Sequence, residues 1–261
     1  MKTPLSLDLA RRITATVLAA AATTLMLWPG IAGGVAHAAF TQDFRLEDCS
    51  WSSRGSQNPY FNLKPGYQLI LEGEEDDEGE IILVRAEVTM LKQTERITFE
   101  TPNGNTMSVK ARVMEEREFQ DGELVEVSRN WMARCRETSD IFYFGEDVDD
   151  YEDGEIVGHE GAWRSGVDGA LPGIIMPGRY LLGAKYFQEV APGVALDRGR
   201  HVGMGIQVPT AAGTFDDCVA VLDSTALDPD AEGDLKLYCP GVGIVMDEEI
   251  VLIEINHGVN R

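Results

Sequence analysis

The side chains best suited to chemistry are a few histidines and carboxylates. His159 and Glu160 are adjacent, and His201 lies further along the chain. Imidazole nitrogens and carboxylate oxygens bind zinc and similar metals, which can activate a water molecule for attack. One hypothesis is therefore a metal-assisted hydrolase or lyase that uses His159, Glu160 and His201. The alternative is that they are unrelated surface side chains, since the chain has neither a G-x-S-x-G nor an H-E-x-x-H motif.

Acidic side chains gather in two further segments, EGEEDDEGE (72–80) and GEDVDDYEDGE (145–155). Calcium takes six to eight oxygen ligands, so such segments can bind it. Neither segment matches the D-x-[DN]-x-[DN]-G calcium loop, because Tyr151 occupies the third position counted from Asp149. A site for calcium or another divalent cation at Asp147 and Asp149 is one hypothesis, and a solvated acidic turn is the other.

Four cysteines in an exported chain predict two disulfides. Alternating apolar residues on either side of Asp228 and Pro229 predict a hairpin that places Cys218 opposite Cys239. Cys49 and Cys135 then pair by elimination, which would fasten the amino-terminal segment to the sheet. Zinc is disfavoured because no pair has C-x-x-C spacing.

Residues 1–38 have the features of a signal peptide. A basic start precedes an apolar run, and Ala36-His37-Ala38 matches the pattern that signal peptidase cleaves. An uncleaved membrane anchor is the alternative. Cleavage before Ala39 would leave no membrane span and predicts a periplasmic or extracellular protein.

The charge of the chain restricts its partners. The whole chain carries −22, and residues 1–38 contribute +3 − 1 = +2, so the cleaved chain would carry −24. Such a surface repels phosphate backbones, which excludes nucleic acid as a partner.

From Gly66 onward the sequence predicts successive β-strands. Runs such as YQLILEG (67–73), GEIILVRAEVTM (79–90) and TERITFE (94–100) are separated by turn signals, and no window has sustained helical periodicity. The predicted fold is mainly β, an antiparallel meander curled into a barrel or half-barrel. Residues 39–261 would form one domain that begins with an irregular segment, 39–65.

The hairpin around Asp121 and Gly122 can be predicted in more detail. Odd positions in 109–119 and 125–135 are mostly apolar, and even positions are mostly polar. Opposite faces should therefore be core and solvent. Pairing odd with odd predicts a loop of three or five residues, and it would let Glu115, Arg117 and Arg129 neutralise one another.

A glycine-rich region interrupts the strand pattern. Residues 154–205 hold 12 of the 27 glycines, yet they also carry large apolar side chains that a disordered loop lacks. We predict a long loop whose residues 159–187 form a lid or plug over the mouth of the sheet. The predicted ligand-binding residues are Trp163, Ile174, Ile175, Met176, Tyr186 and Trp131.

Five segments carry a resemblance to a known group of proteins: NPYFNLKPG (58–66), YFGEDVDDYEDG (143–154), EGAWRSGVDGALPGIIMPG (160–178), AAGTFDDC (211–218) and YCPGVGIV (238–245). They resemble a group of exported bacterial proteins of unassigned function. More distantly, the last two segments resemble periplasmic half-barrels similar to lipoprotein carriers. The resemblance implies a β-barrel-like fold.

Three functions are consistent with these observations. The first is an exported, soluble binding protein for an apolar or amphipathic molecule or lipid. The second is the metal-assisted enzyme, and the third is a structural protein that docks a partner chain. The first is preferred because a curved sheet offers an apolar surface against which the apolar loop residues can pack. Catalytic motifs, by contrast, are few.

Overall fold

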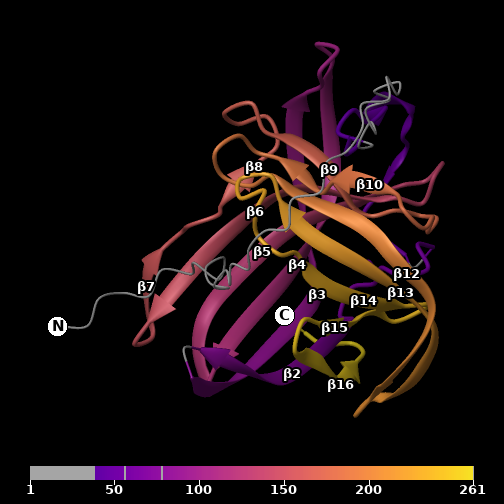
Figure 1. The fold of residues 1–261 in the computed structure, drawn as a ribbon. Helices are drawn as coiled ribbons and strands as arrows, with labels where there is room; N and C mark the ends of the chain where they lie inside the picture. Colours follow the sequence, from indigo (N-terminus) through magenta and orange to yellow (C-terminus); the bar gives the residue numbers. More distant parts are fainter. Residues whose placement is uncertain (1–38, 56, 78, 261) are drawn as a thin grey trace, which may run out of the picture.

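The structure is a computed structural model that describes residues 39–55, 57–77 and 79–260 (Figure 1). The predicted signal peptide, residues 1–38, lies outside the described residues. In the described part of the chain, no helix is both long enough and apolar enough to cross a membrane. A single helical turn, η1 (Leu46–Asp48), precedes the strands.

The fold is a large antiparallel β-sheet, which confirms the predicted class. Figure 1 shows the long strands β3–β6 side by side and curving toward β12–β14. The first half of the sheet consists of β2 (Gln68–Asp77), β3 (Glu80–Glu100), β4 (Thr106–Gln120), β5 (Glu123–Cys135) and β6 (Ile141–Glu152). The second half consists of β12 (Asp197–Thr210), β13 (Gly213–Thr225), β14 (Asp234–Cys239), β15 (Gly243–Asp247) and β16 (Ile250–Asn256).

The sheet curls until its two ends are neighbours in the chain. Strand order runs β10-β12-β13-β14-β15-β16-β2-β3-β4-β5-β6-β9-β11, with β9 (Leu171–Met176), β10 (Lys185–Phe187) and β11 (Glu189–Val190). Only Gln188 separates β10 from β11, and its backbone N–H donates to the Asp197 carbonyl at 2.8 Å. The chain itself therefore joins the two edges, and the sheet is a nearly closed barrel.

The β4–β5 hairpin shows how a bulge sets which residues face each other. Asp121 and Gly122 have φ of 50° and 86°, as a two-residue type I′ turn requires. The register then shifts by one residue next to Phe119, and Val113 consequently lies opposite Trp131. Odd residues pair with odd residues as predicted. The predicted loop of three or five residues was wrong: the loop has two residues, and the bulge next to Phe119 shifts the register so that odd residues face odd residues.

Both faces of this hairpin are buried, whereas one was predicted to face solvent. Met114 and Met132 point into the barrel, while Val113 and Trp131 pack on its outer face. Residues 40–52 cover that outer face, with Phe44 and Trp51 packing edge-on against Phe142. The hairpin therefore packs against a core on each of its faces, although its even positions are mostly polar in sequence. Residues 40–52 complete the outer core.

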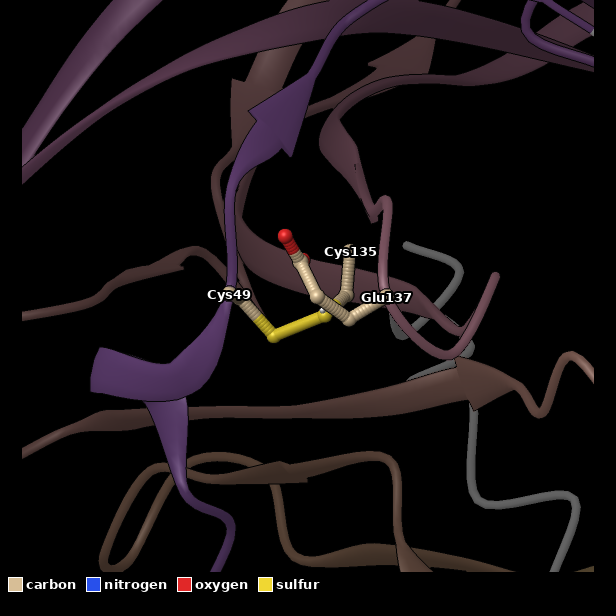
Figure 2. Close-up of side chains that lie close together, drawn as sticks. All are labelled: Cys49, Cys135 and Glu137. Carbon is tan, nitrogen blue, oxygen red and sulfur yellow. Dashed lines mark hydrogen bonds between the residues drawn. A yellow bond between two sulfur atoms is a disulfide. The ribbon is translucent and has the colours of Figure 1, made fainter.

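Two disulfides hold this arrangement, and both pairings are as predicted. Cys49–Cys135 fastens the amino-terminal segment to β5 beside β1 (Trp51–Ser52), and Cys218–Cys239 joins β13 to β14. Figure 2 shows Glu137 next to the first disulfide, where its carboxylate accepts the Ser50 N–H at 2.7 Å.

The segment 58–66, predicted to be irregular, closes one end of the barrel. The Asn58 side-chain amide donates to the carbonyls of Ser139, Met176 and Pro177 at 3.0–3.1 Å. The Pro59 carbonyl accepts the Gly241 N–H at 2.7 Å, and Leu63 is fully buried. The segment therefore spans the turns at this end, and it is the base of the barrel.

The glycine-rich region 154–205 is more regular than predicted. It contains β7 (Glu155–Gly158) and β8 (Trp163–Arg164), which pair with β6, followed by β9, β10, β11 and the start of β12. Gly173 lies so close to the backbone of 187–188 that a Cβ atom would meet it at 2.4 Å. The glycines thus allow strands to approach closely, and residues 159–187 form part of the barrel wall.

Candidate functional site

The barrel encloses a cavity of about 1580 Å³. Phe61 and Asn62 of the base segment line its closed end. At the opposite end, lining residues come from the end of β2 and from the turns after β13 and β15. The cavity is therefore a deep pocket with one mouth.

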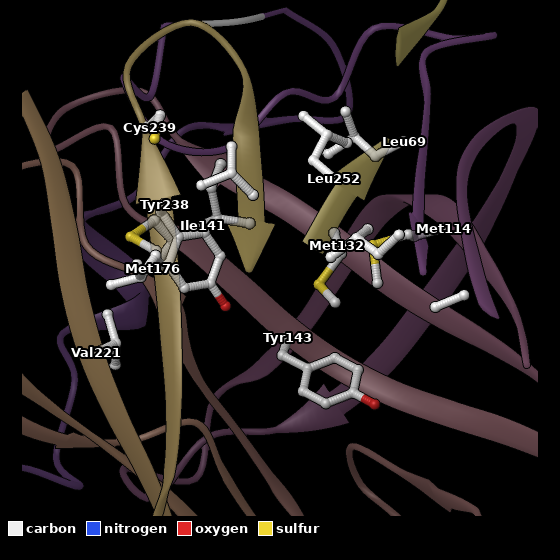
Figure 3. Packing of buried hydrophobic residues seen from close by; sticks show 14 of the residues in the cluster. Leu69, Met114, Met132, Ile141, Tyr143, Met176, Val221, Tyr238, Cys239 and Leu252 are labelled. Atoms are coloured by element: carbon white, nitrogen blue, oxygen red, sulfur yellow. The ribbon is translucent and has the colours of Figure 1, made fainter. Parts of the chain in front are cut away.

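The deep part of the cavity is apolar and rich in methionine. Met90 lies directly opposite Met114 across β3 and β4, and Met132 follows on β5. Figure 3 shows Met114 and Met132 on neighbouring strands, with Tyr143 of β6 and Tyr238 of β14 nearby. Methionine side chains are flexible and polarizable, so they adapt to ligands of different shape. Met114 and Met132 occupy even-numbered positions, which were predicted to face solvent, so the sequence analysis did not select them. Two methionines on an otherwise polar strand face were the signal that could have found them.

The mouth is strongly acidic. Among the described lining residues, Lys236 is the sole Lys or Arg, and there are no histidines. The lining carboxylates are Glu74, Glu75, Asp76, Glu116, Glu146, Glu189, Asp197, Asp223, Asp228, Asp230, Glu232, Asp234, Asp247, Glu248 and Glu249. A positive or neutral group is favoured there over an anion.

Lys236 offers little free positive charge. Its Nζ lies 3.0 Å from Asp247 and 3.9 Å from Asp223. Burial lowers the pKa of Lys236, but these two carboxylates outweigh burial and hold the pKa well above its ordinary value. The lysine is therefore charged and already neutralised.

Two carboxylates line the middle of the cavity, and neither belongs to an ion pair among the described residues. Burial, with Asp247 as a second cause, raises the pKa of Glu116 to about 7, although the charge of Lys236 opposes this. Burial also raises the pKa of Glu146 to about 7, although Tyr143 and Ser128 hydrogen bonds oppose it. Both groups would be easier to ionise beside a bound cation.

Glu189 is a more deeply buried carboxylate of the same wall, only 2% exposed. One oxygen accepts the Asp197 N–H at 2.7 Å. Burial and then the charge of Asp197 raise the pKa of Glu189 well above its usual range. Burial therefore favours the neutral, protonated form of Glu189 over its carboxylate.

A group of three carboxylates, Glu75, Glu248 and Glu249, stands at the mouth, with one oxygen from each within 4.8 Å of the others. Burial and the neighbouring Asp234 raise the pKa of Glu248 to about 8. Glu75 belongs to the acidic segment 72–80, so calcium binding by that segment stays a prediction.

The structure divides the predicted ligand-binding residues between two cores. Trp163 and Ile175 line the cavity, and Met176 belongs to the core cluster around it. Trp131, Ile174 and Tyr186 pack instead in the outer core. In this outer core the guanidinium of Arg164 lies over the Trp131 ring, with its Cζ 4.5 Å from the centre of that ring. Ile174 and Tyr186, expected in a lid, lie in the strands β9 and β10 and face the outer core, because strand alternation sends neighbouring residues to opposite faces.

The structure brings two of the five predicted metal ligands, Asp149 and His159, into contact, but it does not assemble the five into one cluster. Asp149 contacts His159 at 3.1 Å and Arg129 at 2.9 Å, while Asp147 is exposed. The Glu160 N–H bonds to Asp150 at 3.1 Å. Within the described residues, no metal-sized cluster includes any of the five predicted ligands.

His201 lies elsewhere, in an aromatic environment. Its ring stacks on Tyr180 at 3.8 Å, and its Nε2 is 3.2 Å from the Tyr186 hydroxyl. Burial lowers the pKa of His201, so the ring is neutral. The contacts describe a core histidine and give no support to the hydrolase hypothesis.

Comparisons with known proteins give little beyond these observations. No protein-family model and no curated protein matches the chain. A protein from Bacteroides fragilis described as exported with a YmcC-like fold is 14% identical, with a TM-score of 0.36 over 76% of this chain and 99% of its own. A protein from Parabacteroides distasonis described as a lipoprotein is 11% identical, with a TM-score of 0.33 over 78% and 100%. Such low TM-scores support no further inference, and neither description mentions a lipoprotein carrier.

Proposed function

We propose that the protein is exported and binds an amphipathic small molecule inside the barrel. The observation that carries this proposal is the single-mouthed cavity, with an apolar depth and an acidic entrance. Export is supported by the signal-like sequence of residues 1–38 and by two disulfides, which persist in oxidising compartments.

The apolar part of the ligand would occupy the methionine-lined depth. Ligand pockets commonly measure roughly 300–1,000 Å³, so about 1580 Å³ suits a molecule with a long apolar chain. Each buried methylene contributes about 0.8 kcal/mol, and a chain of several such groups supplies useful affinity.

The polar part would lie between the middle of the cavity, near Glu116 and Glu146, and the acidic mouth. Lys236 is neutralised by its two carboxylate partners, so the mouth offers no counter-charge to an anionic head group. A cationic or neutral head group is therefore expected. Dodecyltrimethylammonium should displace a neutral probe from the cavity more effectively than dodecyl sulfate does.

A cavity-filling substitution tests this proposal. Val88 of β3 is half-buried and lines the cavity, whereas Leu83 of the same strand is 47% exposed on the outside. Val88→Trp should weaken binding of the fluorescent probe N-phenyl-1-naphthylamine by about tenfold, which is ~1.4 kcal/mol. Leu83→Trp is the matched control and should leave probe affinity unchanged. Thermal unfolding of both variants shows whether the barrel is intact.

The proposal fails if the wild-type protein does not bind the probe. It also fails if the two tryptophan variants, both folded, lose affinity equally. Both results would place apolar binding outside the cavity.

A further inference from the structure

A second pocket, of about 320 Å³, lies at the closed end of the barrel and has the opposite charge. Five cationic side chains line it: Arg54, Lys92, Lys110, Arg112 and Arg136. Trp51, Ser52, Ser53 and Thr94 complete the lining, so its described residues include no Asp or Glu.

Four parts of the chain bring these cations together. Lys110 and Arg112 lie on β4, and Lys92 lies where β3 shifts register against it. Arg136 directly follows β5, and Arg54 follows β1, which pairs with β5. The Cys49–Cys135 disulfide fixes β1 at this place.

Arg112 is held rigidly in the wall of the pocket, because it is only 3% exposed and its guanidinium is fixed by backbone carbonyls. Its Nε donates to the Ser53 carbonyl at 3.0 Å, and its Nη1 lies 3.1 Å from the Leu91 carbonyl and 2.8 Å from that of Lys92. Within the described structure its Nη2 makes no hydrogen bond. The backbone therefore orients the guanidinium and leaves one nitrogen for a ligand.

A second donor in the pocket is also without a partner. The indole Nε1 of Trp51 is buried and has no hydrogen-bond acceptor in the described structure. Because an unsatisfied buried donor is unfavourable, a bound acceptor that reached it would stabilise the site.

The missing counter-charge is unexpected in this chain, where 44 acidic residues outnumber 22 Lys and Arg. No ion pair among the described residues involves the five pocket cations. Glu137 is nearby, but its carboxylate accepts the Ser50 N–H and lies beside the disulfide (Figure 2).

We propose that this pocket binds an oxyanion of the phosphate or sulfate class, either free or as a monoester on a lipid or sugar. Guanidinium groups match the geometry of such anions, and lysines add point charges. The acidic mouth does not cancel this attraction. Glu116, the cavity carboxylate on the same strand, is four residues from Arg112 on β4, roughly 13 Å at ~3.3 Å per residue. That distance exceeds one Debye length at physiological salt, which is about 8 Å, so salt screens the two charges from each other.

Isothermal titration calorimetry with inorganic phosphate at physiological ionic strength, where the acidic cavity is screened, tests the site. Lys110→Gln and Arg136→Gln change exposed side chains, so both variants should fold, and each should weaken phosphate binding by about tenfold. Arg96→Gln is the matched control, because Arg96 lies opposite Lys110 and bonds to Ser108 outside the pocket. The control removes the same charge and should change affinity less than about twofold.

Vesicles of phosphatidylcholine with and without phosphatidic acid separate the two sources of the anion. Binding to phosphatidic acid vesicles that Lys110→Gln abolishes would assign the site to a lipid head group. Phosphate binding without vesicle binding would assign it to a free or soluble oxyanion. Absence of both, or equal losses in Lys110→Gln and Arg96→Gln, would overturn the proposal. Neither result depends on whether the barrel binds an amphipathic molecule.

Discussion

At the residue scale, the buried carboxylates of the cavity determine how stability depends on pH. Burial raises the folded-state pKa of Glu116 and Glu146 to about 7, and that of Asp223 to about 6. A raised pKa means that the folded protein binds protons more tightly than the unfolded chain does. Stability from these groups therefore increases as pH falls through the folded pKa toward the unfolded value.

We predict that the midpoint temperature of thermal unfolding rises by several degrees when the pH is lowered from about 8 to about 5. His201 opposes this trend, because its lowered pKa removes stability on acidification, but it is one group against several. Differential scanning calorimetry at constant ionic strength measures the effect. The double variant Glu116→Gln, Glu146→Gln should flatten the dependence. A wild-type midpoint that falls over this range would show that these carboxylates are solvated.

Sequence reasoning reached some of the residue-level contacts. It anticipated that Glu115, Arg117 and Arg129 would neutralise one another, and Glu115 lies 2.9 Å from Arg117 and 3.6 Å from Arg129. It placed Trp131 in the ligand site, whereas Trp131 packs outside the barrel. Alternation shows which residues share a face, but it does not show which face will be the interior.

At the element scale, the base segment 58–66 closes one end of the barrel. Residues 159–187 were expected to cover the mouth, and they form part of the wall instead. Nothing in the sequence of the base segment shows strand alternation, so its function as a closing element depends on contacts with distant turns. The amide of Asn58 supplies three of these contacts, and its carbonyl oxygen accepts the Tyr60 N–H at 2.8 Å. The strands and the Cys218–Cys239 disulfide, by contrast, follow from local alternation and turn residues, and the Cys49–Cys135 disulfide follows by elimination.

We predict that Asn58→Ala lowers the free energy of unfolding by about 1–3 kcal/mol, because buried carbonyls lose their donor. Asn62→Ala is the control, since the Asn62 side chain accepts only the exposed Lys64 N–H and should have a smaller effect. Urea unfolding followed by tryptophan fluorescence measures both. Equal losses would mean that Asn58 does not fasten the base.

At the scale of the whole molecule, opposite charges are separated along the barrel. The open end carries the acidic mouth, and the closed end carries the five cations of the second pocket, which form no ion pair with a described residue. Net charge alone, −22 for the chain, indicated only that nucleic acid is an unfavourable partner. The separation depends on which turns meet at each end, and that follows from the order of strands around the barrel.

The most direct test of the central claim is NMR of protein labelled with ¹³C at the methionine ε-methyl groups. The cavity methyls of Met90, Met114 and Met132 should shift when N-phenyl-1-naphthylamine is added, because its aromatic rings would lie against them. Met107, in the outer core, and Met204, which is 59% exposed, should not shift. Shifts confined to Met107 or Met204 would contradict an interior ligand site.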